Sequence, residues 1–377
     1  MAHIRDRGRD QQRRWQARYR DPAGGERSRT FARRIDAQRW LDEVTADLVT
    51  GRYVDPRAGK VTLESFAWRW LDSQTFDPTT WEGAERRLRL HILPTLGRIE
   101  LRSLRPSMIQ AWLKGREGAA PASVRIMLVN LSAILGAAVE DGLIPVNPCD
   151  SPSVSAPRID KRRVVPWTVE VARTIVDSHP DEYRAAPVLG AGCGLRQGEI
   201  LGLRVENVDF LRRVIHVVQQ VKIIGGKPVL APPKGRLERS VPMPDVVAME
   251  LAEHMRRIGI SQGQFFVWKD GGLIHRTYFN NRIWKPSLTR AEVSPTRDNG
   301  MHALRHHYAS VLLDGGVSIR ALADYLGHSD PGFTLRVYAH LMPESEDRAR
   351  AVVDAAFGAP AESLRNKGIA DGGTVNW

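Results

Sequence analysis

Residues 302 to 338 read HALRHHYASVLLDGGVSIRALADYLGHSDPGFTLRVY. Apolar residues recur at helical spacing here, which predicts helices over residues 302–313, 319–326 and 331–340. The stretch also holds side chains suited to acid–base chemistry and phosphate binding, namely His302, Arg305, His328 and Tyr338. It therefore predicts a mainly helical domain that carries a reactive site near its end.

The segment upstream of this stretch is predicted to be helical with one β interruption. The expected helices and strands cover residues 245–258 and 277–285, and residues 214–221, 229–231 and 239–242. Turns are expected at Gly225-Gly226 and at Lys234-Gly235. We therefore expect a mainly α domain over residues 165–357 with a small antiparallel β-sheet, followed by a loose tail over 358–377.

A run of serine, proline and charged residues separates this domain from the segment before it. The composition of residues 151–164 is typical of a linker. Residues 59–150 are predicted to be all helical, with helices over 63–71, 80–90, 106–114 and 122–140. The chain is thus expected to be multidomain.

The N-terminal residues 1–58 predict a small α+β module. Trp15, Ala17 and Tyr19 alternate with polar residues as in a strand with one basic face, and a helix is expected from Asp36 to a C-cap at Gly51. A strand ribbon of this kind can enter a DNA major groove. The candidate DNA-binding residues are Arg14, Arg18, Arg20, Arg27 and Arg29. An arginine-rich surface without a partner is the alternative interpretation.

Charge favours nucleic acid over that alternative. The net charge is +12, and residues 1–34 hold eleven arginines against four acidic residues. Such a local excess favours a polyanion, because neutralised phosphates release counterions. Neither a signal peptide nor an apolar run long enough for a membrane span is evident. The two cysteines lack metal-ligand spacing, so a cytoplasmic location is expected.

Four short patches carry the candidate chemistry: residues 194–199, Lys234, residues 302–305, and residues 326–328 with Tyr338 ten residues later. Each patch is weak alone, but their combination is what cleavage of a phosphodiester without a metal requires. Arg196 and Arg305 are candidates for a guanidinium clamp on the phosphate oxygens.

The remaining candidates serve proton transfer and attack. His302 and His328 can accept a proton and hydrogen-bond the phosphate, and Lys234 can protonate the leaving oxygen. Tyr338 would attack and hold the strand as a phosphotyrosyl ester. The ester conserves the bond energy, so a second hydroxyl can reseal the strand without ATP.

Competing assignments fit the sequence less well. Tyr308 and Tyr325 lie on apolar stripes and are interpreted as core residues. His302 and His306 have the i, i+4 spacing of a zinc pair, but the glutamate of a zinc protease is missing. We therefore expect no metal and no cofactor.

The four patches resemble the tyrosine recombinase family, specifically phage-type integrases with an additional N-terminal arm-binding domain. The likeness is sharp over residues 165–356 and looser over the helical segment, which is similar to the family's core-binding domain. It implies phosphate-binding roles for Arg196 and Arg305, a general-acid role for Lys234 and an orienting role for Glu199. It implies that His302 and His328 assist and that Tyr338 is the nucleophile. Gly235 follows the lysine where the family commonly has threonine or serine.

The resemblance also implies partners. Family members act as a homotetramer on double-stranded DNA with core and arm attachment sites, and usually need a DNA-bending host factor and a directionality factor. The expected setting is the cytoplasm of a bacterial host, at the nucleoid. Two alternatives stay open: a type IB topoisomerase-like strand transferase, and a non-catalytic DNA-binding regulator.

Overall fold

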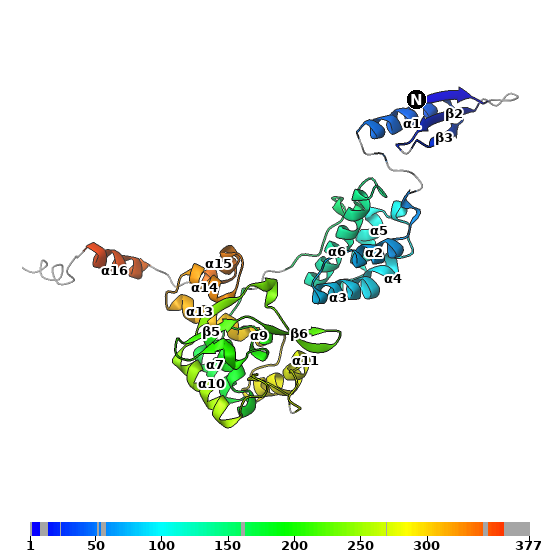
Figure 1. The fold of residues 1–377 in the computed structure, drawn as a ribbon. Coiled ribbons are helices and arrows are strands. Elements are labelled where there is room, and N and C mark those ends of the chain that lie inside the picture. Colours follow the sequence, from blue (N-terminus) through cyan, green and yellow to red (C-terminus); the bar gives the residue numbers. More distant parts are fainter. Residues whose placement is uncertain are drawn as a thin grey trace, which may run out of the picture. The chain divides into compact units, whose positions relative to one another are not determined.

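The computed structural model describes residues 2–7, 14–22, 24–50, 53, 58–159, 163–268, 270–341 and 346–357. The chain divides into two compact units, residues 1–161 and residues 162–377 (Figure 1). The predicted C-terminal tail over residues 358–377 and the predicted C-cap Gly51 lie outside the described residues.

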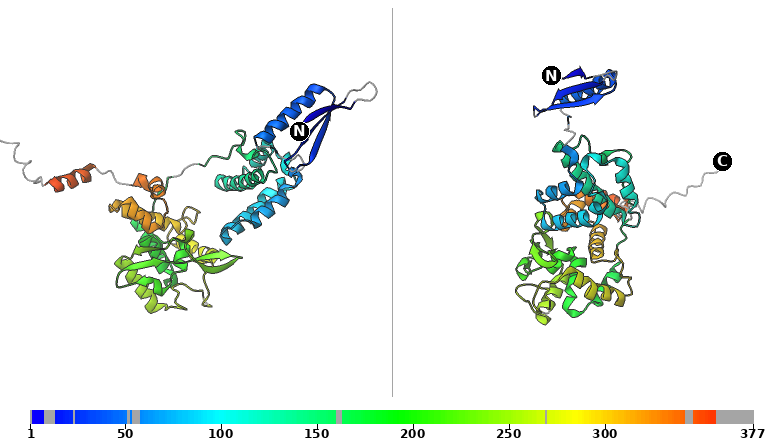
Figure 2. Two further views of the ribbon diagram at one scale, coloured as in Figure 1. Left: turned by 45° about the horizontal axis from the view of Figure 1, so that its top comes forward. Right: turned by 90° about the vertical axis from the view of Figure 1, so that its right-hand side faces the viewer.

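The first unit begins with a three-stranded antiparallel sheet and a helix on one face (Figure 2). Its elements are β1 (His3–Asp6), β2 (Trp15–Arg20), β3 (Glu26–Phe31) and α1 (Arg34–Val49). Ala17 and Tyr19 of β2 are buried against Ala37 and Leu41 of α1. Their alternation with polar residues explains the position of α1, because only one face of the sheet is apolar.

The second part of this unit is all helical, as predicted. It comprises η1 (Ala58–Lys60), α2 (Leu63–Asp72), α3 (Pro78–Arg87), η2 (Leu88–Ile92), α4 (Leu93–Leu96), η3 (Leu101–Ser103), α5 (Pro106–Lys114), α6 (Pro121–Glu140) and η4 (Pro148–Asp150). Side-chain caps begin three of these elements: Thr62 accepts a hydrogen bond from the Ser65 amide, Asp77 accepts one from the Thr79 amide, and Asn147 accepts one from the Cys149 amide. The four helices expected from periodicity are all confirmed.

Within the described chain, α6 is the one helix long and apolar enough to cross a membrane by length and composition. A core helix can pass the same test, so a single such helix is weak support for a span. The buried side chains of α6 pack in the core of the helical segment: Val124, Met127, Leu131, Ile134, Leu135 and Ala138. These buried residues make up 33% of its most apolar window, so packing accounts for part of its apolar character.

The second unit is mainly helical around two small antiparallel sheets. Its helices are α7 (Val169–Asp177), η5 (Asp181–Tyr183), α8 (Ala185–Cys193), α9 (Gln197–Leu201), η6 (Val205–Asn207), η7 (Lys234–Arg236), α10 (Asp245–Arg257), α11 (Arg276–Phe279), η8 (Asn280–Trp284), α12 (Lys285–Arg290), α13 (His302–Asp314), α14 (Ile319–Leu326), α15 (Pro331–Tyr338), η9 (Ala339–Leu341) and α16 (Glu346–Phe357). Its strands are β4 (Val208–Asp209), β5 (Val214–Val217), β6 (Gln220–Ile224), β7 (Lys227–Ala231) and β8 (Arg239–Pro242). This is the predicted mainly α domain with a small β portion.

The predicted single strand over residues 214–221 is wrong in detail. The structure breaks it at Val218-Gln219, so that β5 pairs with β4 and β8 while β6 pairs with β7. The polar pair Gln219-Gln220 lies at the break, but the apolar residues on either side of it were interpreted as one strand because a change of sheet leaves no mark on hydrophobic periodicity. The β6–β7 hairpin projects from the body of this unit in both Figure 1 and Figure 2.

Helix α8 lies at the centre of the core, in contact with α10 and α13. It ends at Gly194, which has a φ of +62°. A Cβ at Gly194 would lie 2.4 Å from Cδ1 of Tyr308 on α13. Both the positive φ and this contact require glycine. The tight turn at Gly194 places Arg196 at the start of α9.

Candidate active site

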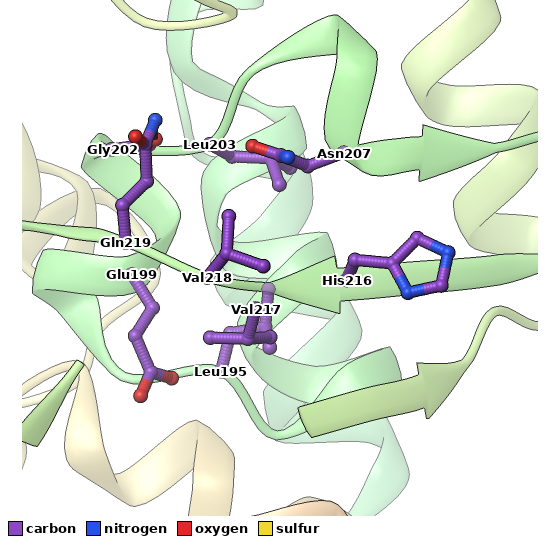
Figure 3. Close-up of a pocket in the computed structure, with 9 residues that line it drawn as sticks. All are labelled: Leu195, Glu199, Gly202, Leu203, Asn207, His216, Val217, Val218 and Gln219. Carbon is purple, nitrogen blue, oxygen red and sulfur yellow. Dashed lines mark hydrogen bonds between the residues drawn. The ribbon is translucent and has the colours of Figure 1, made fainter. Parts of the chain in front are cut away.

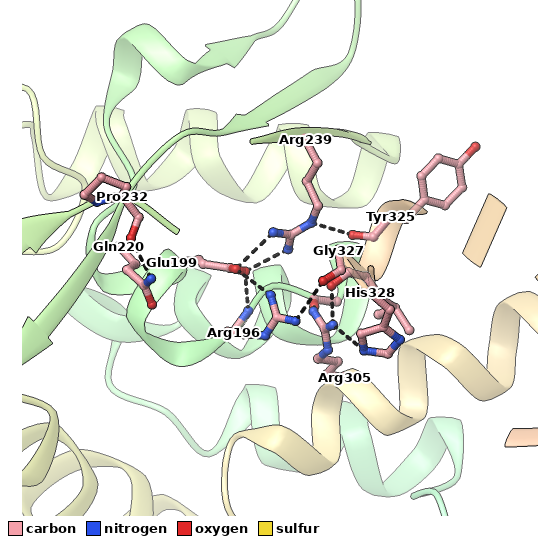
Figure 4. A network of polar contacts seen from close by, with 11 residues as sticks. Arg196, Glu199, Gln220, Pro232, Arg239, Arg305, Tyr325, Gly327 and His328 are labelled. Atoms are coloured by element: carbon pink, nitrogen blue, oxygen red, sulfur yellow. Dashed lines mark hydrogen bonds and ion pairs between the residues drawn. The ribbon is translucent and has the colours of Figure 1, made fainter. Parts of the chain in front are cut away.

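Arg196 and Glu199 bind each other at the start of α9. The Arg196 amide donates to Glu199 Oε2 at 2.8 Å, and its Nη1 donates to Oε1 at 2.9 Å. Nη2 of Arg196 donates to the carbonyl oxygen of Gly327 at 3.2 Å (Figure 4). These contacts fix the guanidinium at the surface of the site while a quarter of its side chain stays exposed.

Glu199 is held from its other side by Arg239 of β8. Nη1 and Nη2 of Arg239 donate to the two carboxylate oxygens at 2.9 and 2.8 Å. Burial would raise the pKa of Glu199, but hydrogen bonds and charge from Arg239, with help from Arg196, lower it to about 2. The carboxylate is therefore ionised at neutral pH and joins two guanidinium groups.

Arg239 was not expected from the sequence, where it only began a short strand. Its side chain is 7% exposed. Nε of Arg239 also donates to the carbonyl oxygen of Tyr325 at 2.7 Å, just before Gly327 and His328. No local pattern could have revealed it, because both partners are far away along the chain.

Arg305 of α13 is the most deeply buried cation of the site, at 1% exposure. Its Nη1 donates to the carbonyl oxygen of Gly194 at 2.7 Å, and its Nη2 donates to that of Leu326. Nε has no hydrogen-bond partner in the described part of the chain. Burial, together with repulsion from Arg196, lowers the pKa of Arg305 to about 9, so it is still charged at neutral pH. A buried cation with a spare donor is suited to binding an anion.

His328 completes the network from the loop after α14. Its Nε2 lies 3.1 Å from Nη2 of Arg305, and its Nδ1 lies 2.7 Å from Oγ1 of Thr334. A guanidinium only donates, so Nε2 accepts and Nδ1 carries the proton toward Thr334. Burial and the charge of Arg305 lower the pKa of His328 to about 4, so the ring is neutral at pH 7.

Tyr338 ends α15 and is 1% exposed. Its Oη lies 2.8 Å from Nδ1 of His306. Burial raises the pKa of the phenol, and the charges of Arg305 and Arg196 partly offset that effect. The phenol is therefore protonated at neutral pH.

His306 is a site residue that the sequence interpretation missed. It was considered only as half of a zinc pair with His302, and the described residues hold no group of three metal-ligating side chains. The i, i+4 spacing that suggested zinc does place both rings on one face of α13, with centroids 4.6 Å apart. The same spacing could have marked His306 as a member of the site.

Among the described residues, no hydrogen bond joins His302 or Lys234 to this network. The His302 ring is exposed and contacts the ring of His306. Partial desolvation by neighbouring side chains, together with the charges of Arg305 and Arg196, lowers the pKa of His302 to about 4. Lys234 is exposed in η7, between β7 and β8.

The segment that carries Lys234 is anchored at both ends. Before it, Nε2 of Gln220 donates to the carbonyl oxygen of Pro232 at 2.8 Å. After it, Arg239 binds Glu199 (Figure 4). Gly235 within it has a φ of +73°, which β-branched threonine tolerates poorly. The turn thus accounts for glycine at the position where a hydroxyl residue was expected.

The crevice behind Glu199 is lined by Leu195, Asn207, His216 and neighbouring residues, and it is too narrow to admit water (Figure 3). Arg196 is reached from the surface, with a quarter of its side chain exposed, which suits a polymer with phosphates on its outside.

The N-terminal arginines fall on two faces of the first sheet. The β2–β3 register pairs Ala17 with Arg29 and Tyr19 with Arg27, so Arg27 and Arg29 stand on the α1 side. Arg18 and Arg20 stand on the opposite, open face, and Arg14 is exposed just before β2. Arg27 donates to Asp21 at 2.8 Å, while Arg18 donates to Glu26 and Gln16.

Three family descriptions match the chain. Residues 167–345 match the Phage integrase family, residues 9–50 match the phage integrase N-terminal domain, and residues 62–115 match the phage integrase N-terminal SAM-like domain. Together they cover each of the three parts described above.

Two of the curated relatives are integrases that match nearly the full chain. The putative prophage phiRv2 integrase of Mycobacterium tuberculosis is 26% identical over 336 residues, which is 87% of this chain and 88% of that protein. The integrase of Mycobacterium phage L5 is 26% identical over 355 residues, covering 89% and 93%. Tyrosine recombinase XerC of Myxococcus xanthus is 30% identical over 227 residues, covering 58% and 71%.

Solved structures share the fold. The Tn1549 transposon integrase in complex with transposon right end DNA has a TM-score of 0.68 at 22% identity, covering 78% of this chain and 99% of that one. A lambda integrase tetramer bound to a Holliday junction has a TM-score of 0.60 at 18% identity, covering 85% and 91%. From its matched domains and relatives, the chain belongs to the phage integrase family and is a site-specific tyrosine recombinase.

Proposed function

We propose that Tyr338 cleaves DNA by forming a 3′-phosphotyrosyl ester, and that the residues around it activate the scissile phosphate. The observation that carries this proposal is one continuous polar network. It joins Arg196, Glu199, Arg305 and His328. The positive charges of Arg305 and Arg196 act on the buried Tyr338 phenol and favour its ionised form. Such an arrangement suits a reaction in which negative charge builds up on phosphate oxygens.

Arg196 and Arg305 bind the two non-bridging oxygens of the phosphate. Arg196 reaches the surface of the site, and Arg305 contributes a charge that no directly bonded carboxylate neutralises among the described residues. Planar guanidinium donors stabilise the charge that grows on these oxygens in the transition state. Glu199 keeps Arg196 in place and does not contact the DNA.

Proton transfers accompany the attack. The Oη–P bond forms as the bond from phosphorus to O5′ breaks, and Lys234 gives a proton to the leaving O5′. His302 and His328 hydrogen-bond the phosphate. His328 can donate a hydrogen bond to the phosphate only when its Nε2 also carries a proton. The negative charge of the phosphate favours that protonation, while Nδ1 stays bonded to Thr334. Rejoining reverses these steps with a different strand's 5′-hydroxyl.

The partners of the reaction follow from the relatives. Lambda integrase forms a tetramer on a Holliday junction, and we infer a homotetramer of the present chain on core sites of two duplexes. The open face of the N-terminal sheet, with Arg18 and Arg20 and with Arg14 at its entry, binds arm sites of the same DNA. Arg27 and Arg29 line its edge toward α1. A DNA-bending host factor and a directionality factor complete the assembly at the host nucleoid.

A covalent-capture experiment tests the chemistry. Nicked duplexes with randomised sequence are incubated with the full chain, and DNA bound to protein on a denaturing gel is recovered and sequenced. The nick releases a short 5′-hydroxyl fragment and so traps the adduct. We expect the wild type to form an adduct and Tyr338→Phe to form none. An adduct with Tyr338→Phe would refute the nucleophile, and no adduct with either would favour a non-catalytic regulator.

A second assay separates recombination from strand relaxation. Plasmids that carry two copies of the captured sequence are incubated with the wild type. Exchange between the copies is the expected product, and relaxation without exchange would point to a topoisomerase-like enzyme.

A further inference from the structure

The Tyr338 phenol is held by a residue to which the chemistry above gives no role. Nδ1 of His306 on α13 lies 2.8 Å from Oη of Tyr338 on α15. Tyr338 is 1% exposed, and His306 is half-buried. The two side chains come from different helices, so the contact depends on the tertiary fold.

The direction of this hydrogen bond follows from burial. His306 is the one hydrogen-bond partner of the phenol oxygen within the residues that the structure describes. If Nδ1 carried the proton, the phenolic hydrogen would lack an acceptor in a site closed to water, which is unfavourable. The phenol therefore donates, and Nδ1 presents its lone pair to the proton that must leave when Tyr338 attacks.

The other basic groups are placed less well for this task. Both nitrogens of His328 are engaged, one by Arg305 and one by Thr334. His302 contacts the ring of His306 rather than the phenol. Among the described histidines, His306 is the one that touches the attacking oxygen.

We propose that His306 is a catalytic residue that accepts the phenol proton when Tyr338 attacks the scissile phosphate. The inference rests on the proposed function of Tyr338. As the Oη–P bond forms, the proton passes from Oη to Nδ1, while Lys234 protonates O5′ as the P–O5′ bond breaks. During rejoining, the imidazolium returns its proton to Oη as the Oη–P bond breaks, and the attacking 5′-hydroxyl gives its proton to Lys234.

The electrostatic setting suits a base that acts only on bound DNA. Burial, followed by repulsion from His302 and Arg305, lowers the pKa of His306 to about 4, so it is neutral and able to accept at pH 7. Within the described residues, the charged or titratable groups that act on the His306–Tyr338 pair are Arg305 and His302 on α13 and Arg196 at the start of α9. A phosphate bound to the arginines adds negative charge that stabilises the imidazolium. Without DNA, the same cations keep the base unprotonated.

The test measures adduct formation in a single turnover as a function of pH, on the duplex captured with the wild type. His306→Asn keeps a hydrogen-bond acceptor near Nδ1 but no base, and His306→Ala removes both. Each should slow adduct formation about 100-fold at pH 7. His216→Asn is the control, because His216 is exposed and its Nδ1 bonds Ser240 on a different strand; its rate should stay within about twofold of wild type.

The pH profile distinguishes a base from a support for the ring. Without His306, attack depends on ionised phenol, so the rate of either variant should rise about tenfold per pH unit between pH 7 and 9. The wild type should be nearly flat over that range. If the pH profiles of the variants ran parallel to that of the wild type, or if the His306→Asn rate at pH 7 were within about threefold of wild type, the proposal would be overturned.

Added imidazole gives a second readout that folding defects do not imitate. The space left in His306→Ala can take up free imidazole, which should restore at least a tenfold faster rate. Restoration should be absent in Tyr338→Phe. If His306→Ala binds the duplex normally and imidazole has no effect at any concentration, His306 is not the base. Failure of the proposed function is distinct, because the wild type would then form no adduct or Tyr338→Phe would form one.

Discussion

Arg239 and Glu199 form a two-pronged ion pair, with Nη1–Oε1 at 2.9 Å and Nη2–Oε2 at 2.8 Å, in which both side chains are buried. The pair joins three parts of the site. Glu199 binds Arg196 in α9, Arg239 binds the carbonyl of Tyr325 near His328, and β8 continues the segment that carries Lys234. One arginine outside the predicted set thus positions three residues within it.

Removing this arginine should cost both stability and activity. Arg239→Gln leaves the Glu199 carboxylate buried beside a single guanidinium, and breaking a buried pair costs about 3–5 kcal/mol. We expect a loss of that size in urea unfolding and a severe loss of adduct formation. Arg239→Lys keeps the charge but not the fork, so it should recover only part of the stability.

Arg213→Gln is the matched control for Arg239. Arg213 pairs with Asp245 at the surface, where both side chains are more than half exposed. Surface pairs contribute about 0–1 kcal/mol, so this variant should unfold almost like the wild type. Equal effects of the two substitutions would show that Arg239 does not position the site.

Acid should destabilise the second unit through Glu199. Its pKa is about 2 in the folded protein against 4.5 for an ordinary glutamate. A lowered folded-state pKa gives stability that is present above about pH 5 and is lost as pH falls toward 2, by about 3 kcal/mol. Unfolding free energies measured across that window should fall more steeply for the wild type than for Glu199→Gln. Parallel curves would contradict the lowered pKa.

The turn at Gly194 should tolerate no side chain. Gly194→Ala combines a positive φ with a Cβ 2.4 Å from the Tyr308 ring, so strain and overpacking together should destabilise by about 3 kcal/mol. Because Arg196 follows two residues later, adduct formation should also fall. Gly142→Ala has a similar φ of +67° with nothing within 4 Å, and should lose only about 1 kcal/mol. Thermal unfolding of both variants measures the difference, and equal losses would exclude the Tyr308 contact as a cause.

The sequence predicted those features that local patterns encode. Helix periodicity located α2, α5, α13 and α14 to within a residue or two. The family resemblance, not a local pattern, suggested Glu199, which contacts Arg196 in the structure. The role of Arg239 could not be predicted, because its partners Glu199 and Tyr325 lie on other elements that meet β8 only in the folded structure. A similar limit hid the role of His306, whose spacing was visible but whose partner Tyr338 lies 32 residues away.

The pairing of β2 with β3 shows a similar limit of sequence-based prediction at the N-terminus. Alternation in β2 identified one basic face correctly, since Arg18 and Arg20 share the open side of the sheet. It could not tell that Arg27 and Arg29 face the α1 side, because that depends on how the turn after Asp21 sets the pairing. Sequence alone therefore grouped five arginines that the fold divides.

That division predicts unequal effects on DNA binding. Each DNA phosphate that an arginine no longer neutralises reduces the slope of log K against log salt by about 0.9. Arg18→Ala with Arg20→Ala, in the full chain on a long duplex, should flatten the slope by about 2. Arg27→Ala with Arg29→Ala should change it by less than about 1, because both stand on the α1 side of the sheet. Fluorescence anisotropy between about 50 and 300 mM salt measures both slopes. Equal flattening by the two pairs would mean that DNA contacts the edge of the sheet rather than its open face, and an unchanged slope in both would remove the N-terminal module from DNA binding.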